Sequence, residues 1–402
     1  MARIFISACS IILYLGVGRS TDAFGVSTAR INLAELGTRE SDLSMIAFKL
    51  PGIPIRRIAN KLNPFKGKQS STKLNDAATT TIPSPPPPVT TSTTDSTLQS
   101  LKIGSYFALW YALNIGYNIY NKKVLNAIPT LTYSVAWLQL ALGLLYVFPL
   151  WALGIRKAPE LNNEEVRNLV PVSILHLLTH IGAVVSLGAG AVSFTHVVKA
   201  AEPAVSAFLS AVFLRSFLAA PVYLSLLPVM GGVALASLTE LSFTWLSFGA
   251  DMTSNVASAA RGIVGKATMN KPKGKNMSTA NLYAVMTIIA TVLFTPIALA
   301  KEYSQIVPVV KSIAQSGNGV KILIEVLLSG LFYYLYNDVA FLCLENVSPV
   351  THALGNTIKR VVIIFTSVLV FGNKLTAQGA LGSGIAIFGV LLYSLASNRF
   401  KK

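Results

Sequence analysis

Ten apolar stretches follow one another between residues 103 and 397, and they constrain the fold more than any other feature of the chain. Each is about 20 residues long, the length that a helix needs to cross the hydrocarbon core of a bilayer. We place them at 103–121, 132–153, 169–188, 192–214, 220–238, 242–265, 279–300, 320–344, 348–371 and 376–397. Several contain glycine and polar residues and should face other helices as well as lipid. The sequence thus predicts an all-α integral membrane protein with ten transmembrane helices in one domain, 101–398, before a basic tail at 399–402.

The composition agrees with a membrane protein. Of the 402 residues, 52% are hydrophobic and only 12% are charged, whereas a soluble domain carries about 25% charged residues. These values argue against a soluble enzyme and against a disordered chain. The formal net charge is +17. Because this charge is spread over a very apolar chain, we expect a lipid bilayer and basic loops or a basic pore, and no nucleic-acid partner. Two cysteines, Cys9 and Cys343, allow no disulfide framework.

The first hundred residues differ in composition and are expected to direct the protein rather than to fold with it. Arg3, an apolar run at 4–16 and small residues up to Ala23 form the pattern of a cleavable signal peptide, 1–23. From Phe24 a segment rich in Ser and Thr and poor in acids has a transit-peptide composition, and a Pro/Thr/Ser linker completes the segment 24–100. The arrangement resembles the two-part leaders of algae with secondary plastids, in which Phe commonly follows the cleavage site. A plain secretory signal with a disordered tail is the alternative.

Ten crossings would place both termini on one side of the membrane, and the basic residues near the span ends indicate which side. On the side of the termini we count twelve: Lys102, Arg156, Lys157, Arg167, Arg215, Lys266, Lys271, Lys273, Lys275, Arg399, Lys401 and Lys402. On the opposite side we count six: Lys122, Lys123, Lys301, Lys311, Lys321 and Lys374. The excess predicts that both termini lie on the topologically cytoplasmic side, which is the stroma in a plastid inner membrane.

The two halves of the domain are weakly similar to each other. Aligning 202–214 with 359–371 pairs Phe208 with Phe365 and Ser210 with Ser367. These segments belong to the fourth and ninth spans, so five crossings would be followed by five inverted ones. Inverted repeats of this kind are typical of transporters that bind substrate at the midplane between the halves.

Three cations lie inside spans rather than in loops: Lys199, Lys359 and Arg360. Each costs roughly 2.5–3.5 kcal/mol at a helix centre, which favours a wet cavity over burial in lipid. Glu202, three residues after Lys199, is expected to neutralise one of them. The alternative is that the side chains extend to an interface. Adjacent Lys and Arg suit phosphate, because Arg offers a two-pronged donor and Lys a compact charge.

Further polar residues share helix faces with this region. His176 and His180 lie on one face of the third span, and Tyr333, Tyr336 and Asn337 lie on one face of the eighth. A histidine pair on an apolar helix is more often an interior pair than a ligand, whereas the tyrosine face is equally consistent with interior packing and with a cavity wall. Arg261 in the sixth span is placed either inside the bundle or at its rim. No Cys or carboxylate cluster joins the histidines, so we expect neither a metal nor a cofactor.

Motifs of catalysis are not found. The chain has neither a Gly-rich phosphate loop with its Lys-Ser/Thr nor a G-x-S-x-G sequence. The acids inside the spans are scattered over several helices. The chain is therefore not expected to be an enzyme.

Four segments, 110–129, 191–208, 331–341 and 351–373, together resemble the plastid phosphate translocators. The specific part is a VSFTH-x-x-K-x-x-EP sequence at 192–203 with a later GN-x-x-KR sequence at 355–360. The resemblance covers about residues 101–397. It implies a ten-helix protein of the drug/metabolite transporter superfamily with a five-plus-five inverted repeat. It also implies exchange of inorganic phosphate for phosphorylated sugars or C3 acids.

The resemblance assigns roles to individual residues. It places the phosphate group on Lys199, Lys359 and Arg360, and the organic part of the substrate on His180 and Tyr336. Arg261 would extend the positive surface and Glu202 would contribute to a gate. Ala183 stands where triose-phosphate members tend to carry a hydroxyl residue, which leaves the choice between C3 and C6 substrates open. Phosphoenolpyruvate exchangers tend to carry Asn at the His180 position, so His180 counts against that subtype.

Two classes of function remain after these observations. The first is an antiporter of the plastid envelope, on the innermost membrane, that exchanges phosphate for triose phosphate or 3-phosphoglycerate. Hexose and pentose phosphates are alternative substrates. The second is a nucleotide-sugar transporter of the Golgi type. The Lys-Arg pair and the leader favour the first.

Overall fold

The computed structural model describes residues 93–269, 274–347, 349–372 and 376–400. Within these residues the secondary structure is helical, apart from one isolated β-bridge between Glu160 and Lys275. The predicted signal peptide, 1–23, lies outside the described residues, as do the part of the predicted leader at 24–92 and the tail residues 401–402.

Helices occupy all ten predicted segments. They are α3 (Thr93–Ala127), α4 (Thr132–Ala152), α5 (Asn163–Ala189), α6 (Val192–Val198), α7 (Glu202–Leu214), α8 (Ala220–Leu224), α9 (Leu226–Leu238), α10 (Trp245–Met269), α11 (Thr279–Gln315), α12 (Gly319–Asn346), α13 (Pro349–Phe371) and α14 (Ala377–Arg399), with 3₁₀ turns η2 (Pro129–Leu131) and η3 (Lys199–Ala201). Within the described residues, eight helical segments are long and apolar enough to cross a membrane. The helices α3 and α10 are not among the eight. The structure thus confirms a helical protein with multiple membrane spans, and ten crossings stay a prediction.

The helix boundaries follow local chemistry. Asn162 and Glu165 form a reciprocal capping box at the start of α5. The helix α3 begins at Thr93, inside the segment that the sequence marked as linker, because the proline run ends at Pro88 and nothing after it prevents a helix. Lys122, counted above with the loop cations, lies inside α3, and its Nζ donates to the carbonyls of Leu187 (2.8 Å) and Gly190 (2.9 Å) at the end of α5.

The fourth predicted span is one rod with a break. The residue four positions before Pro203 is Lys199, and a proline at that spacing removes the helical hydrogen bond to its carbonyl and crowds it. The chain responds with the 3₁₀ turn η3 between α6 and α7. The corresponding rod in the second half, α13, is a continuous helix. The break therefore falls at one of the two intramembrane lysines and not at the other.

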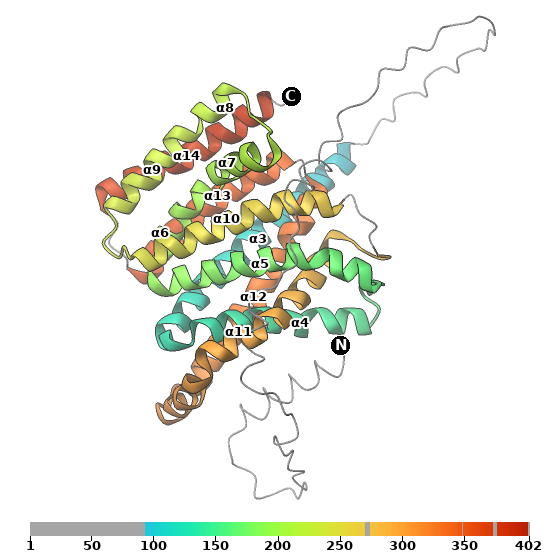
Figure 1. Cartoon of the computed structure of the whole chain (residues 1–402), viewed down its shortest axis with the longest axis vertical. Helices are drawn as coiled ribbons and strands as arrows, with labels where there is room; N and C mark the ends of the chain where they lie inside the picture. Colours follow the sequence, from blue (N-terminus) through green and yellow to red (C-terminus); the bar gives the residue numbers. More distant parts are fainter. Residues whose placement is uncertain (1–92, 270–273, 348, 373–375, 401–402) are drawn as a thin grey trace, which may run out of the picture. The chain divides into compact units, whose positions relative to one another are not determined.

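Small residues bring the helices together. The helices α9 and α14 lie side by side in Figure 1, and α5 packs along α10. A Cβ added at Gly232 would lie only 2.3 Å from the backbone nitrogen of Ala386, and one at Gly382 only 2.6 Å from that of Ala236. Such close contact of backbones is how helices associate in a membrane, where apolar burial alone gives no preference for protein over lipid.

Candidate functional site

A cavity of about 320 Å³ lies between α3, α5, η3, α7, α10, α12 and α13. All seven side chains that the sequence singled out line it: His180, Lys199, Glu202, Arg261, Tyr336, Lys359 and Arg360. A second cavity of about 620 Å³ shares Glu202, Arg261 and His352 with the first. It extends past Glu165 near the start of α5 and Thr268 near the end of α10. The first cavity thus continues toward that end of the bundle.

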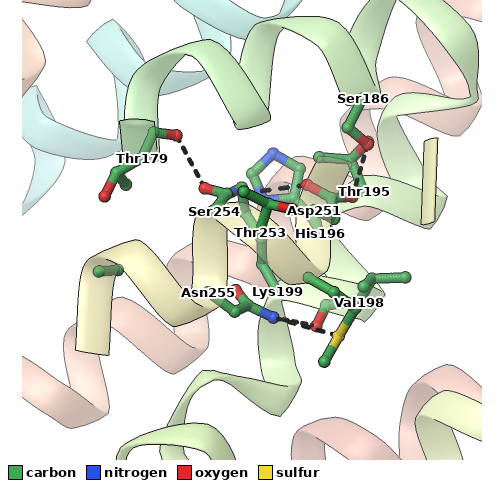
Figure 2. A network of polar contacts seen from close by, with 12 residues as sticks. Thr179, Ser186, Thr195, His196, Val198, Lys199, Asp251, Thr253, Ser254 and Asn255 are labelled. Atoms are coloured by element: carbon green, nitrogen blue, oxygen red, sulfur yellow. Dashed lines mark hydrogen bonds and ion pairs between the residues drawn. The ribbon is translucent and has the colours of Figure 1, made fainter. Parts of the chain in front are cut away.

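Lys199 is held from α10 (Figure 2). Its Nζ donates to Ser254 Oγ at 2.7 Å and lies 3.9 Å from Asp251 Oδ1. Ser254 in turn donates to the carbonyl of Thr179 at 2.8 Å. The sequence predicted that Glu202 neutralises one of the three cations, and in the structure Glu202 forms its ion pair with Arg360. The carboxylate beside Lys199 comes from a neighbouring helix, a contact that spacing along one helix does not reveal.

Asp251 is completely buried and sits among hydroxyl groups. Ser186 Oγ donates to Asp251 Oδ2 at 2.6 Å, and the same hydroxyl lies 2.9 Å from Thr195 Oγ1 and 3.0 Å from Ser247 Oγ. Figure 2 shows Ser186 and Thr195 converging on this carboxylate beside Lys199. Hydroxyl donors of this kind stabilise an ionised carboxylate that has no access to water.

Glu202 pairs across the cavity with Arg360. Arg360 Nη2 lies 3.1 Å from Glu202 Oε2, and Ser258 donates to Glu202 Oε1 at 2.6 Å. Arg360 Nη1 is buried and makes no hydrogen bond within the described residues. One arm of the guanidinium is therefore satisfied by protein, and the other is a buried donor without a hydrogen-bond partner in the described structure.

Lys359 has a different environment. Its Nζ lies over the ring of Trp110 at 4.6 Å from the centroid and over that of Tyr336 at 5.9 Å. Trp110 is itself buried and stacks on His352, with centroids 4.8 Å apart. In the described part of the chain no carboxylate lies within ion-pair distance of Lys359. Aromatic faces are thus its nearest partners, and its ammonium group remains without an ion pair to a carboxylate.

The two histidines of α5 make different hydrogen bonds. His180 Nε2 lies 3.0 Å from the carbonyl of Ala136, so this nitrogen must carry the proton and donate. Its Nδ1, buried and without a hydrogen bond in the described structure, is left as an acceptor. His176 Nδ1 instead accepts from Arg261 Nη1 at 3.0 Å. His180 therefore keeps one buried acceptor without a partner in the described structure, whereas His176 holds Arg261 at the cavity wall.

The charges around the cavity do not balance. Lys199, Arg261, Lys359 and Arg360 contribute four positive charges, and Glu202 and the Asp251 behind Lys199 contribute two negative ones. The excess of two matches a phosphate group or phosphate ester, which carries about −1.5 to −2 near neutral pH. Lys ammonium groups and an Arg fork are the donors that phosphate prefers.

A comparison with known families agrees with this chemistry. The model of the triose-phosphate transporter family matches residues 101–394. The chain belongs to this family. It is 42% identical to glucose-6-phosphate/phosphate translocator 2, chloroplastic, of Arabidopsis thaliana over 75% of this chain and 77% of that protein. It is 41% identical to the triose phosphate/phosphate translocator, chloroplastic, of Pisum sativum over 74% and 73%. It is 37% identical to phosphoenolpyruvate/phosphate translocator 1, chloroplastic, of Oryza sativa subsp. japonica over 93% and 90%.

In this member of the triose-phosphate transporter family, sequence reasoning missed several residues of the cavity region. Trp110 entered the prediction only as the first residue of the segment 110–129, and Asp251 is one of the acids that the prediction treated as scattered over the spans. His196 lines the cavity and bonds through Nε2 to Asn118 Oδ1 at 2.9 Å. The available signal was Asp251, since an acid within an apolar span requires a partner. No group of three potential metal ligands comes together within the described residues.

Proposed function

We propose that this chain exchanges inorganic phosphate for triose phosphate, 3-phosphoglycerate or a related phosphorylated sugar across a plastid envelope membrane. The observation that carries the proposal is the excess of two positive charges around a buried cavity of about 320 Å³. The names of the relatives agree, because each of the three denotes a phosphate translocator for a phosphorylated metabolite.

In this proposal the phosphate group binds to Lys199, Lys359 and Arg360. Lys359 and the free Nη1 of Arg360 provide donors that protein groups do not occupy, and Lys199 has two N–H groups beyond its bond to Ser254. His180 Nδ1 accepts a hydroxyl of the organic part, and Tyr336 lies beside Lys359 in the same wall. Arg261 and Glu202, which belong to both cavities, lie on the path by which the ligand enters.

The same proposal includes ten crossings in two inverted halves and transport by alternating access. The most extensive helix contacts support it, because they map onto one another when the first five rods are exchanged with the last five. The pair α3–α12 corresponds to α5–α10, α4–α12 corresponds to α5–α11, and the pairs α4–α11 and α9–α14 each map onto themselves. The helices α3 and α10 also supply Trp110 and Arg261 to the cavity wall, which supports placing both in the membrane.

The proposed location is the innermost membrane of a plastid envelope, with both termini in the stroma. The chloroplastic relatives support the plastid, and the leader composition and the distribution of basic residues support import and orientation. Residues 1–100 fused to a fluorescent protein should label the plastid of an alga with a secondary plastid. Fluorescence confined to the Golgi would contradict this location.

Reconstitution tests the exchange itself. Proteoliposomes preloaded with phosphate are offered labelled triose phosphate, 3-phosphoglycerate, glucose 6-phosphate, phosphoenolpyruvate and a UDP-sugar. We expect triose phosphate and 3-phosphoglycerate to enter fastest, and only when phosphate is present inside. Faster entry of glucose 6-phosphate would favour the hexose-phosphate alternative, which the 42% identity to a glucose-6-phosphate translocator and Ala183 in the cavity wall also support. Entry of the UDP-sugar alone would refute phosphate exchange.

A further inference from the structure

Asp251 carries a charge that the proposed phosphate contacts do not use. It lies on α10, completely buried, behind Lys199 and outside the set of side chains that line the cavity. A carboxylate in such a position costs several kcal/mol to desolvate, and a well-packed neutral residue would avoid that cost. Its presence therefore calls for an explanation in terms of what it does to Lys199.

Lys199 has its charge offset by one residue and donates its hydrogen bond to another. At 3.9 Å, Asp251 Oδ1 is close enough to offset the ammonium charge and too far to accept a hydrogen bond from it. Lys199 gives one hydrogen bond to Ser254 and retains two donors for a ligand in the cavity. Asp251 thus lowers the net charge of the site without occupying its donors.

Lys199 and Arg360 act electrostatically on this carboxylate from the surrounding helices. Lys199 is the nearest cation, and Arg360 and Arg261 lie farther around the same cavity, where Glu202 is the second acid. The hydroxyl of Ser186, itself in contact with Thr195 and Ser247, donates directly to Asp251 Oδ2. Burial disfavours the ionised form of Asp251, and the cations on one side and the hydroxyl donor on the other counteract this effect.

We propose that Asp251 is a positioning residue that selects ligands by charge: it holds the cavity at an excess of two positive charges and so favours doubly over triply charged phosphate compounds. The inference rests on the proposed function. With Asp251 ionised, a dianion neutralises the site and a phosphorylated carboxylate with three charges leaves one negative charge in excess. Without the carboxylate the excess would be three, and the preference would move toward the trianion.

The test compares two ligands of equal carbon number, dihydroxyacetone phosphate (two negative charges at pH 8) and 3-phosphoglycerate (three). Full-length protein is reconstituted with internal phosphate, and kcat/KM for uptake is measured for each. In Asp251→Asn we expect the ratio of 3-phosphoglycerate to dihydroxyacetone phosphate to rise at least about fivefold, as one unit charge within about 10 Å at an effective dielectric near 20 implies. The matched control is Glu345→Gln, an exposed acid of α12, which should leave the ratio unchanged.

A ratio in Asp251→Asn within twofold of wild type would overturn the inference while leaving phosphate exchange intact. A wild-type protein that exchanges no phosphate would instead overturn the proposed function. If Asp251→Asn does not fold, Asp251→Ser removes the same charge within the hydroxyl cluster and is judged by the same ratio. If neither variant folds, the inference is tested by the melting temperature of wild-type protein in detergent. The inference then requires dihydroxyacetone phosphate to raise the melting temperature more than equal 3-phosphoglycerate at pH 8, and the reverse order contradicts it.

Discussion

The two halves of the protein present their intramembrane lysines in opposite ways. Lys199 lies in the 3₁₀ turn between α6 and α7, donates to Ser254 and faces the carboxylate of Asp251. Lys359 lies within the continuous helix α13, over the ring of Trp110, with no carboxylate at ion-pair distance in the described structure. The lysine of the first half is therefore balanced by an acid of α10, in the second half, whereas the lysine of the second half has no such partner in the described structure.

The weak internal repeat makes the contrast sharper. The alignment that pairs Phe208 with Phe365 places Glu202 opposite Lys359, so the two halves carry opposite charges at matching positions. In the fold, Glu202 reaches across to Arg360, the neighbour of Lys359 in sequence. At the cavity, therefore, the two aligned segments differ in charge. This difference predicts that the negative charge of the ligand is neutralised mainly by residues of α13.

Lys359→Gln should have the largest effect on transport. It removes a charge-assisted contact of about 1.5–3 kcal/mol to phosphate, so uptake of every substrate, phosphate included, should fall at least about tenfold. Because Lys359 leaves no carboxylate unpaired, thermal stability in detergent should be nearly unchanged. Lys321→Gln, the same change at an exposed position of α12, is the control. Normal phosphate exchange in Lys359→Gln would contradict the placement of the phosphate site at Lys359.

Lys199→Gln should lower stability as well as transport. Removing one partner of a buried pair leaves the other charge uncompensated, which lowers the free energy of unfolding by about 3 kcal/mol. The melting temperature should therefore drop in Lys199→Gln and recover in the double variant with Asp251→Asn, whereas transport should not recover. Equal melting temperatures for Lys199→Gln and Lys359→Gln would remove the distinction between the two lysines.

His180→Ala should have a smaller and more selective effect. It removes the Nδ1 acceptor, so uptake of triose phosphate should fall about fivefold, the value of one hydrogen bond, while phosphate exchange stays within about twofold. Tyr336→Phe keeps the ring beside Lys359 and should show a weaker loss in the same direction. A loss of equal size for phosphate and triose phosphate in His180→Ala would place His180 at the phosphate group instead.

Much of this arrangement could be predicted from the sequence, because apolar length identifies spans and a cation within a span requires a cavity. The seven singled-out residues do converge on one cavity. The pairings among them could not be predicted, since Lys199–Asp251 and Glu202–Arg360 each join different helices and depend on how those helices pack. The contact between Lys359 and the Trp110 ring was missed for the same reason, because Trp110 lies far away in sequence.

Charge balance also predicts that uptake of one ligand is coupled to export of another. Alternating access requires the cavity to close on both sides midway through the cycle, and an empty closed cavity would hold two uncompensated positive charges away from water. A phosphate group with about two negative charges removes that cost. The decisive measurement is phosphate uptake into proteoliposomes with and without internal phosphate. Uptake should be at least about tenfold faster with internal phosphate, as a desolvation cost above about 1.4 kcal/mol implies. Equal rates in the two preparations would contradict a carrier whose crossing depends on ligand charge.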